Sequence, residues 1–223
     1  LIKSNLFFFD KTIVIKNTSG GIGKIKLSKN ENKFRSFTEF LFFDTFNVLS
    51  QEPDECLGAY VISMTSSASD ILSVSFLQKE AKIKNKLRVV PLFETLEDLI
   101  NAKPIMENLF SQKWYRKLTN HKQEVMIGYS DSSKDAGKMC ASWHQYKAQE
   151  EIVKLAKKYK IEIVFFHGRG GSAGRGGGPI LATLRSLPPN SVNGKIRITD
   201  QGEVIQQKYG YEPLAKYNLC SYI

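Results

Sequence analysis

The chain of 223 residues combines 42% apolar with 24% charged residues, a balance that is typical of globular proteins and excludes a collagen-like repeat or a wholly disordered tail. Its formal charge of +10 raises nucleic-acid binding as an alternative. The lysines, however, are spread along the chain without a run of about five or six like charges, which favours a solvated basic surface.

Cysteine and apolar content narrow the class of protein further. Cys56, Cys140 and Cys220 lie far apart, so they form no disulfide framework, and their odd number fits a reducing compartment. No stretch reaches the ~18–20 apolar residues of a membrane span, which predicts that the protein has no membrane partner. The chain begins with Leu1 rather than methionine, so we expect it to be a piece of a longer protein.

Residues 1–43 are rich in Lys, Asn, Phe and Ile and show no clear hydrophobic period. Within them, residues 17–24 superficially resemble a phosphate-binding loop. That motif requires glycine where Thr18 stands, and Ser or Thr where Ile25 stands. The segment is therefore interpreted as a turn between two short strands.

Five apolar runs predict β-strands in the remainder of the chain. Near-continuous apolar runs of this length are typical of strands that are covered on both faces, as in a parallel sheet. The runs are residues 59–64, 87–93, 124–129, 161–166 and 195–199.

Helical patterns lie between these runs. Three strand ends are followed by the spacing of a capping box, which predicts a helix start after each. A stripe of apolar residues predicts a long helix that ends near residues 157–160, with Trp143 in the core. The box pairs are Ser67 with Asp70, Thr95 with Asp98, and Ser132 with Asp135, and the stripe comprises Met139, Trp143, Tyr146, Val153 and Ala156.

A strand–loop–helix order that is repeated at least four times predicts βα units and a parallel sheet. Both a (β/α)₈ barrel and a doubly wound open sheet would place ligands at the carboxyl ends of the strands. Five strands are too few for a complete barrel. The chemically capable side chains follow the strands directly: Glu94, Asp131, Lys134, His167 and Arg169.

The segment 167–179 carries the strongest signal. Seven of its thirteen residues are glycine, which lets backbone N–H groups approach an anion closely. Arg169 and Arg175 add guanidinium forks that suit phosphate or carboxylate. A flexible RNA-binding stretch is the alternative, but this single block follows an apolar strand directly and is not a low-complexity tail.

Two carboxylates point to a metal ion. Glu94 follows an apolar run and would be costly to bury unpaired, while Asp131 lies at another strand end. Together they suit one Mg²⁺, which takes one or two protein carboxylates and substrate oxygens. The alternative for Glu94 is an exposed first-turn position that favours a helix N-terminus. Lys134, which opens the next helix, suits an anion.

Several stretches together resemble the phosphoenolpyruvate carboxylase family. They occur in the order of that family, and the resemblance covers residues 44–223, while residues 1–43 stay unassigned. It implies an incomplete TIM-type (β/α)₈ barrel of about five parallel strands with flanking helices, after an irregular N-terminal segment. The matching stretches are residues 59–70, 89–98, 125–137, 147–150, 166–179 and 201–203.

The resemblance implies a lyase that joins bicarbonate to phosphoenolpyruvate and yields oxaloacetate and phosphate. By similarity, Glu94 and Asp131 hold Mg²⁺ or Mn²⁺, and Arg169 binds the phosphate. His167 and Lys134 are expected to position bicarbonate or the species made from it.

By the same resemblance, Arg175 is the mobile arginine that closes over the substrate. Phosphoenolpyruvate and bicarbonate are the expected partners, with no nucleic acid and no membrane, in a cytoplasmic homotetrameric parent enzyme. The 223 residues alone are expected to be inactive. Two alternatives stay open: a truncated remnant that keeps only the anion-binding loop, and an RNA-binding protein.

Overall fold

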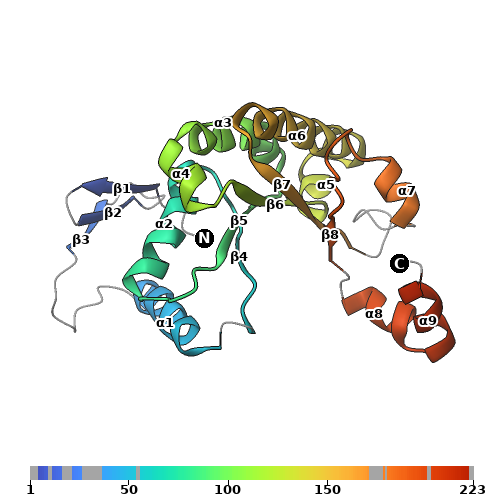
Figure 1. The fold of residues 1–223 in the computed structure, drawn as a ribbon, viewed down its shortest axis with the longest axis horizontal. Coiled ribbons are helices and arrows are strands. Elements are labelled where there is room, and N and C mark those ends of the chain that lie inside the picture. Colours follow the sequence, from blue (N-terminus) through green and yellow to red (C-terminus); the bar gives the residue numbers. More distant parts are fainter. Residues whose placement is uncertain are drawn as a thin grey trace. The chain divides into compact units, whose positions relative to one another are not determined.

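The computed structural model describes residues 5–9, 12–16, 22–26, 37–53, 56–170, 178, 180–199 and 202–220 (Figure 1). The chain divides into two units, Leu1–Val90 and Pro91–Ile223.

The first unit begins with a three-stranded antiparallel sheet. Its strands, in the order β1-β2-β3, are Asn5–Phe9, Thr12–Lys16 and Ile22–Lys26. Strands β2 and β3 flank residues 17–21, which lie outside the described residues, and their pairing fits the predicted turn between two strands.

A small apolar cluster holds the rest of the first unit together. It joins α1 (Phe37–Gln51), β4 (Ala59–Ile62) and α2 (Ala68–Glu80). Phe46 of α1 is almost fully buried and stacks on Tyr60 of β4, with 5.2 Å between the ring centroids. The sequence prediction of a strand near residues 59–64 is thereby confirmed.

A five-stranded sheet follows the order β4-β5-β6-β7-β8. Pairing is parallel from β5 through β8, with Phe93 beside Ile127, Gly128 beside Gly168, and His167 beside Ile198. Strands that neighbour one another in sequence order are typical of a (β/α)₈ barrel, whereas a doubly wound sheet reverses its order at a switch point. The fold is therefore an incomplete α/β barrel, as predicted. The additional strands are β5 (Arg88–Phe93), β6 (Lys122–Gly128), β7 (Glu162–Gly168) and β8 (Arg197–Ile198).

Helices α3 and α6 lie side by side along the sheet of the second unit (Figure 1). Their inner faces and strands β5 to β7 supply its core, including Leu109, Val125, Ile152 and Phe165, each at most 1% exposed. The helices of this unit are α3 (Leu96–Ser111), α4 (Lys113–Leu118), α5 (Ser130–Ala136), α6 (Lys138–Tyr159), α7 (Ile180–Arg185), α8 (Gly202–Tyr209) and α9 (Glu212–Cys220).

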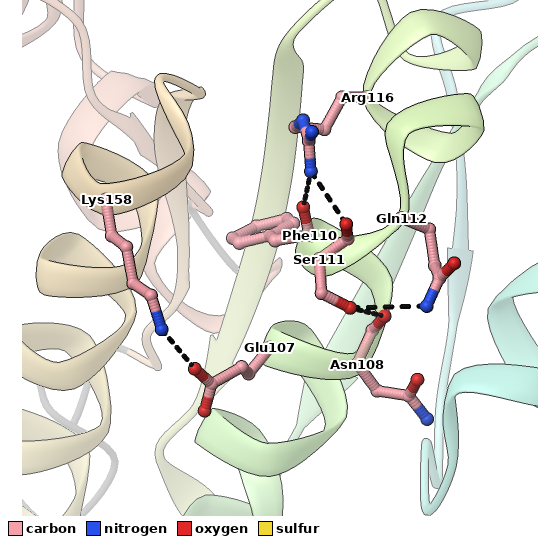
Figure 2. A network of polar contacts seen from close by, with 7 residues as sticks. All are labelled: Glu107, Asn108, Phe110, Ser111, Gln112, Arg116 and Lys158. Atoms are coloured by element: carbon pink, nitrogen blue, oxygen red, sulfur yellow. Dashed lines mark hydrogen bonds and ion pairs between the residues drawn. The ribbon is translucent and has the colours of Figure 1, made fainter.

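Polar contacts secure the end of α3 (Figure 2). Arg116 Nη1 donates to the carbonyl oxygen of Phe110 and, over 2.9 Å, to that of Ser111. These carbonyls belong to the last turn of the helix, which lacks intrahelical donors and attracts cations. Lys158 of α6 pairs with Glu107 of α3 over 2.9 Å, so the ion pair joins the two helices.

The long helix is confirmed, but the prediction that Trp143 belongs to the core is wrong. Trp143 is 60% exposed and Met139 is 87% exposed. The first half of α6 instead buries Ala141 and Gln145, since small and amide side chains let it pack closely. Among the described residues, no helix has the length and apolar character needed to cross a membrane.

Candidate active site

The ends of β5, β6 and β7 meet at one edge of the sheet because these strands are parallel and in register. The next residue after each strand, Glu94, Tyr129 and Arg169 respectively, therefore lies at that edge. In barrel enzymes this carboxyl edge carries the catalytic residues.

Close backbone approach brings Glu94 to the end of β6. A Cβ atom at Gly128 would lie 2.6 Å from Glu94 Cβ and 2.9 Å from its Cα, which is too close for a real side chain. Glycine at position 128 thus allows the two strand ends to touch. The loop is further held by Asp98, whose Oδ2 accepts from the backbone N–H groups of Glu94 and Thr95 over 3.2 and 3.1 Å.

Two of the three predicted capping boxes are confirmed, those of Ser67 with Asp70 and Thr95 with Asp98. The third is wrong because α5 begins at Ser130, directly after β6, so that Ser132 lies inside the helix. Its hydroxyl donates to the carbonyl of Gly128 over 3.2 Å.

Asp135, the second residue of the predicted third capping box, bonds to another helix. Asp135 Oδ2 accepts from the backbone N–H of Leu96 over 3.0 Å, so it satisfies a free donor at the start of α3. Leu96 lies two residues after Glu94, and Asp135 lies four residues after Asp131. The bond therefore ties together the two segments that carry the candidate metal ligands.

Asp131 and Lys134 form an ion pair of 3.0 Å on α5, with side chains 47% and 71% exposed. Lys134 is thus brought to the predicted metal ligand. Because both groups are exposed, this pair is weak, and a cation or an anion of the substrate could compete for either partner.

Sequence reasoning missed Gln145, a buried residue of α6. Its Nε2 donates to the carbonyl of Gly128 over 3.2 Å and to Ser132 Oγ over 2.7 Å. These bonds fix the first turn of α5, and with it the backbone that carries Asp131. The available signal was a pair of amides, Gln145 and Gln149, among the apolar residues that α6 buries.

The donor set suits a hard divalent cation. Glu94 and Asp131 offer carboxylate oxygens from neighbouring strand ends, and Mg²⁺ commonly takes one or two such ligands together with substrate oxygens. No group of three or more potential His, Cys, Asp or Glu ligands occurs in the part of the chain that the structure describes. The assignment of the two carboxylates to one metal ion stays a prediction.

His167 is buried, with 1% exposure, and its Nδ1 lies 2.9 Å from the hydroxyl of Tyr129. Burial, followed by the nearby charge of Arg169, lowers the pKa of His167 to about 4. The imidazole is therefore neutral at physiological pH. Burial also raises the pKa of Tyr129 to about 12, although the charge of Arg169 opposes this shift.

Arg169 packs its guanidinium over the ring of Tyr129, 5.1 Å from Cζ to the centroid. The Thr199 hydroxyl donates to the Arg169 carbonyl over 2.9 Å, which fixes its backbone. Burial lowers the pKa of Arg169. Within the described residues, neither Arg169 Nε nor His167 Nε2 has a hydrogen-bond partner, although both atoms are buried. Buried polar atoms normally have partners, so these two atoms indicate a place for a bound polar group.

Most of the glycine-rich segment, with Arg175, lies outside the described residues. The proposed closing of Arg175 over substrate therefore stays a prediction. Of the sequence-predicted site residues, the structure places Glu94, Asp131, Lys134, His167 and Arg169 in the second unit. Tyr129, which sequence reasoning passed over, contacts two of these residues.

Comparison with known proteins identifies close relatives. A model of the phosphoenolpyruvate carboxylase family matches residues 25–223. Phosphoenolpyruvate carboxylase 3 from Arabidopsis thaliana is 58% identical over 167 residues, which are 75% of this chain and 17% of the relative. An enzyme named phosphoenolpyruvate carboxylase from Flaveria pringlei is 57% identical over 171 residues, covering 77% and 18%. One from Marinomonas sp. (strain MWYL1) is 53% identical over 179 residues, covering 80% and 20%. The chain thus spans only a fifth or less of the length of these relatives.

Proposed function

The chain belongs to the phosphoenolpyruvate carboxylase family, and we propose that it supplies catalytic residues of an enzyme that joins bicarbonate to phosphoenolpyruvate, giving oxaloacetate and phosphate. The observation that carries this proposal is the 58% identity over 167 residues to a carboxylase. A truncated remnant and an RNA-binding protein are less well supported, because the relatives are named as carboxylases.

The proposed metal ligands are Glu94 and Asp131, which would hold Mg²⁺ or Mn²⁺. The close approach of Gly128 to Glu94 and the bond from Leu96 to Asp135 support this assignment. When bound, the metal ion would supply positive charge that stabilises negative charge developing on substrate oxygens.

Arg169 is the proposed phosphate ligand. Its buried Nε without a partner among the described residues supports this role, because a guanidinium donates two parallel bonds to a phosphate group. Arg175 is proposed to close over the substrate and exclude water.

His167 and Lys134 are proposed to orient bicarbonate and the species made from it. A neutral, buried imidazole can hold an oxygen through one N–H without adding a full charge. Lys134 is exposed beside Asp131, and its ammonium group would meet the anionic substrate.

We further propose that residues 44–223 form the catalytic part, although the family match itself begins at residue 25. The whole enzyme is proposed to be a homotetramer that acts in the cytoplasm.

A chimera tests the proposal directly. Residues 25–223 replace the matching segment of the Arabidopsis relative, and oxaloacetate formation is followed with a coupled assay. We expect turnover that depends on phosphoenolpyruvate, bicarbonate and a divalent cation, and that Asp131→Asn abolishes. Glu107→Gln, which removes an exposed ion pair of α3, serves as the matched control and should retain turnover.

A folded but inactive chimera would contradict the proposal and favour the remnant. Salt-sensitive RNA binding by the chain, without turnover in the chimera, would favour an RNA-binding protein.

A further inference from the structure

A buried hydrogen bond joins the ends of β6 and β7. Tyr129, the first residue after β6, places its hydroxyl 2.9 Å from Nδ1 of His167 near the end of β7. The two rings are tilted at 48° with centroids 6.1 Å apart. Any catalytic task of this bond rests on the proposed function, because the bond would act through the contact of His167 with the substrate.

The direction of this bond decides where the imidazole proton lies. A neutral imidazole has one donor and one acceptor nitrogen. A phenol is protonated at neutral pH, and within the described residues His167 Nδ1 is the only acceptor that the structure gives the Tyr129 hydroxyl. If Nδ1 donated instead, the phenol proton would be left without a partner there. Counting partners in this way favours a bond that runs from Tyr129 to Nδ1.

A second proton on the imidazole is disfavoured by its surroundings. The ring is 1% exposed, and the guanidinium of Arg169, two residues along, lies over the Tyr129 ring.

Thr199 holds the backbone of both residues. Its N–H donates to the carbonyl of His167 over 3.0 Å, and its hydroxyl donates to the carbonyl of Arg169 over 2.9 Å. The strand end that carries the imidazole is thus held on both sides, by β8 and by Tyr129.

We infer that Tyr129 is a positioning residue that fixes His167 in the Nε2–H tautomer, so that Nε2 donates a hydrogen bond to an anionic oxygen of the substrate. Nε2 is buried and has no partner within the described residues, as is true of Arg169 Nε. The same tyrosine supports both groups: its hydroxyl holds the imidazole, and its ring face holds the guanidinium.

The hydroxyl of Tyr129 contacts His167 and its ring contacts Arg169, so two variants can remove these contacts separately. Tyr129→Phe removes only the hydroxyl and keeps the ring under Arg169. In the chimera, we expect kcat to fall roughly tenfold, because a hydrogen bond that orients the imidazole contributes about 1.5 kcal/mol, with KM for phosphoenolpyruvate little changed. Tyr129→Leu removes both supports and should also raise that KM.

Tyr115→Phe is the matched control. The Tyr115 hydroxyl is also buried and donates to Gln123 Oε1 over 2.7 Å, but it contacts none of the proposed site residues. Its loss should lower stability and leave kcat unchanged. An equal fall of kcat in Tyr115→Phe and Tyr129→Phe would mean that both hydroxyls are merely structural.

The variant His167→Gln tests whether a fixed N–H donor at this position is enough for activity. The amide nitrogen of Gln can occupy the place of Nε2 as a fixed donor, so His167→Gln should keep part of kcat and His167→Asn should not. Adding Tyr129→Phe to His167→Gln should have little further effect, because the donor no longer depends on the tyrosine. A full additional loss in the double variant would overturn the inference.

NMR spectroscopy can determine the tautomer of His167 without a measurement of activity. The chain has three histidines, so the ¹⁵N signals of His167 in the labelled 223-residue chain are assignable by substitution of His121 and His144. We expect an unprotonated Nδ1 and a protonated Nε2, with a tautomer mixture in Tyr129→Phe. A protonated Nδ1 in the unmodified chain would overturn the inference, whereas an inactive unmodified chimera would count against the proposed function instead.

Discussion

Arg169 is held by its neighbours, while its buried Nε has no hydrogen-bond partner among the described residues. Its backbone is bonded to Thr199, and its guanidinium lies on the Tyr129 ring. The side chain is thus pre-ordered, so that binding an anion costs little further conformational entropy. This setting differs from that of Lys134, which is 71% exposed.

For Arg169→Ala in the chimera, we expect KM for phosphoenolpyruvate to rise about tenfold or more. Hydrogen bonds to charged groups contribute ~1.5–3 kcal/mol, and about 1.4 kcal/mol corresponds to a factor of ten. Arg169→Lys should recover only part of the loss, because an ammonium group lacks the planar fork. Steady-state kinetics decide the matter; an unchanged KM in Arg169→Ala would remove Arg169 from the phosphate site.

His167 makes stability depend on pH. Burial lowers its pKa to about 4 in the folded chain, against about 6.5 when unfolded. Between these values the unfolded state binds more protons, so stability is fully present above pH ~6.5 and is lost as pH falls towards 4. The difference amounts to about 3 kcal/mol at most.

Urea unfolding of the chain and of His167→Gln at pH 7 and pH 5 measures this contribution. We expect the unmodified chain to lose about 2 kcal/mol more than the variant between the two pH values, since glutamine does not titrate. His121 and His144 are common to both proteins. Equal losses would show that His167 titrates normally.

At the scale of elements, the start of α3 and the middle of α5 depend on one another. Asp135 of α5 accepts from the Leu96 N–H at the first residue of α3. We expect Asp135→Ala to destabilise the second unit by about 1 kcal/mol, as for the loss of a helix cap. It should also raise the divalent-cation concentration for half-maximal activity in the chimera, because the segments of Glu94 and Asp131 are no longer tied.

Asp135→Asn is the control for this prediction. Asparagine keeps a side-chain oxygen that can accept from Leu96, so both effects should be smaller than in the alanine variant. A cation requirement that is identical in all three proteins would show that the bond between α5 and α3 does not support the metal ligands.

Element boundaries reveal which sequence signals were reliable. Continuous apolar runs located the central strands β6 and β7, because most of their residues are buried. The Ser132–Asp135 spacing wrongly predicted a capping box, because only Tyr129 separates β6 from α5. Ser132 instead donates to the carbonyl of Gly128, and Asp135 accepts from the N–H of Leu96. The prediction for Trp143 was wrong because the first half of α6 buries Ala141 and Gln145 and leaves its large apolar residues exposed.

On the scale of the whole molecule, the candidate site was predictable where the chemistry of a residue is distinctive. Glu94, Asp131 and Arg169 stand out as charged groups after apolar strands. Tyr129 and Gln145 do not, because their importance arises from pairing across strands and helices. Such partners are revealed only by the register of β6 against β7 and by the packing of α6.

The second unit also presents apolar side chains outward. Trp143 of α6 is 60% exposed, and Tyr211 and Tyr217 beside and within α9 are 68% and 72% exposed. The chain also spans less than a fifth of the length of its plant relatives.

A polypeptide of only these 223 residues is therefore expected to show no carboxylase turnover. A (β/α)₈ barrel closes with eight strands, and the described residues contribute five to the barrel sheet, so substrate bound at its carboxyl edge would remain open to water. Reaction of phosphoenolpyruvate with bicarbonate requires a site that excludes water and holds both anions from several sides. The measurement is a coupled assay for oxaloacetate on the purified chain, with Glu94→Ala as the background. Turnover well above that background would show that the five strands suffice to bind and orient both substrates.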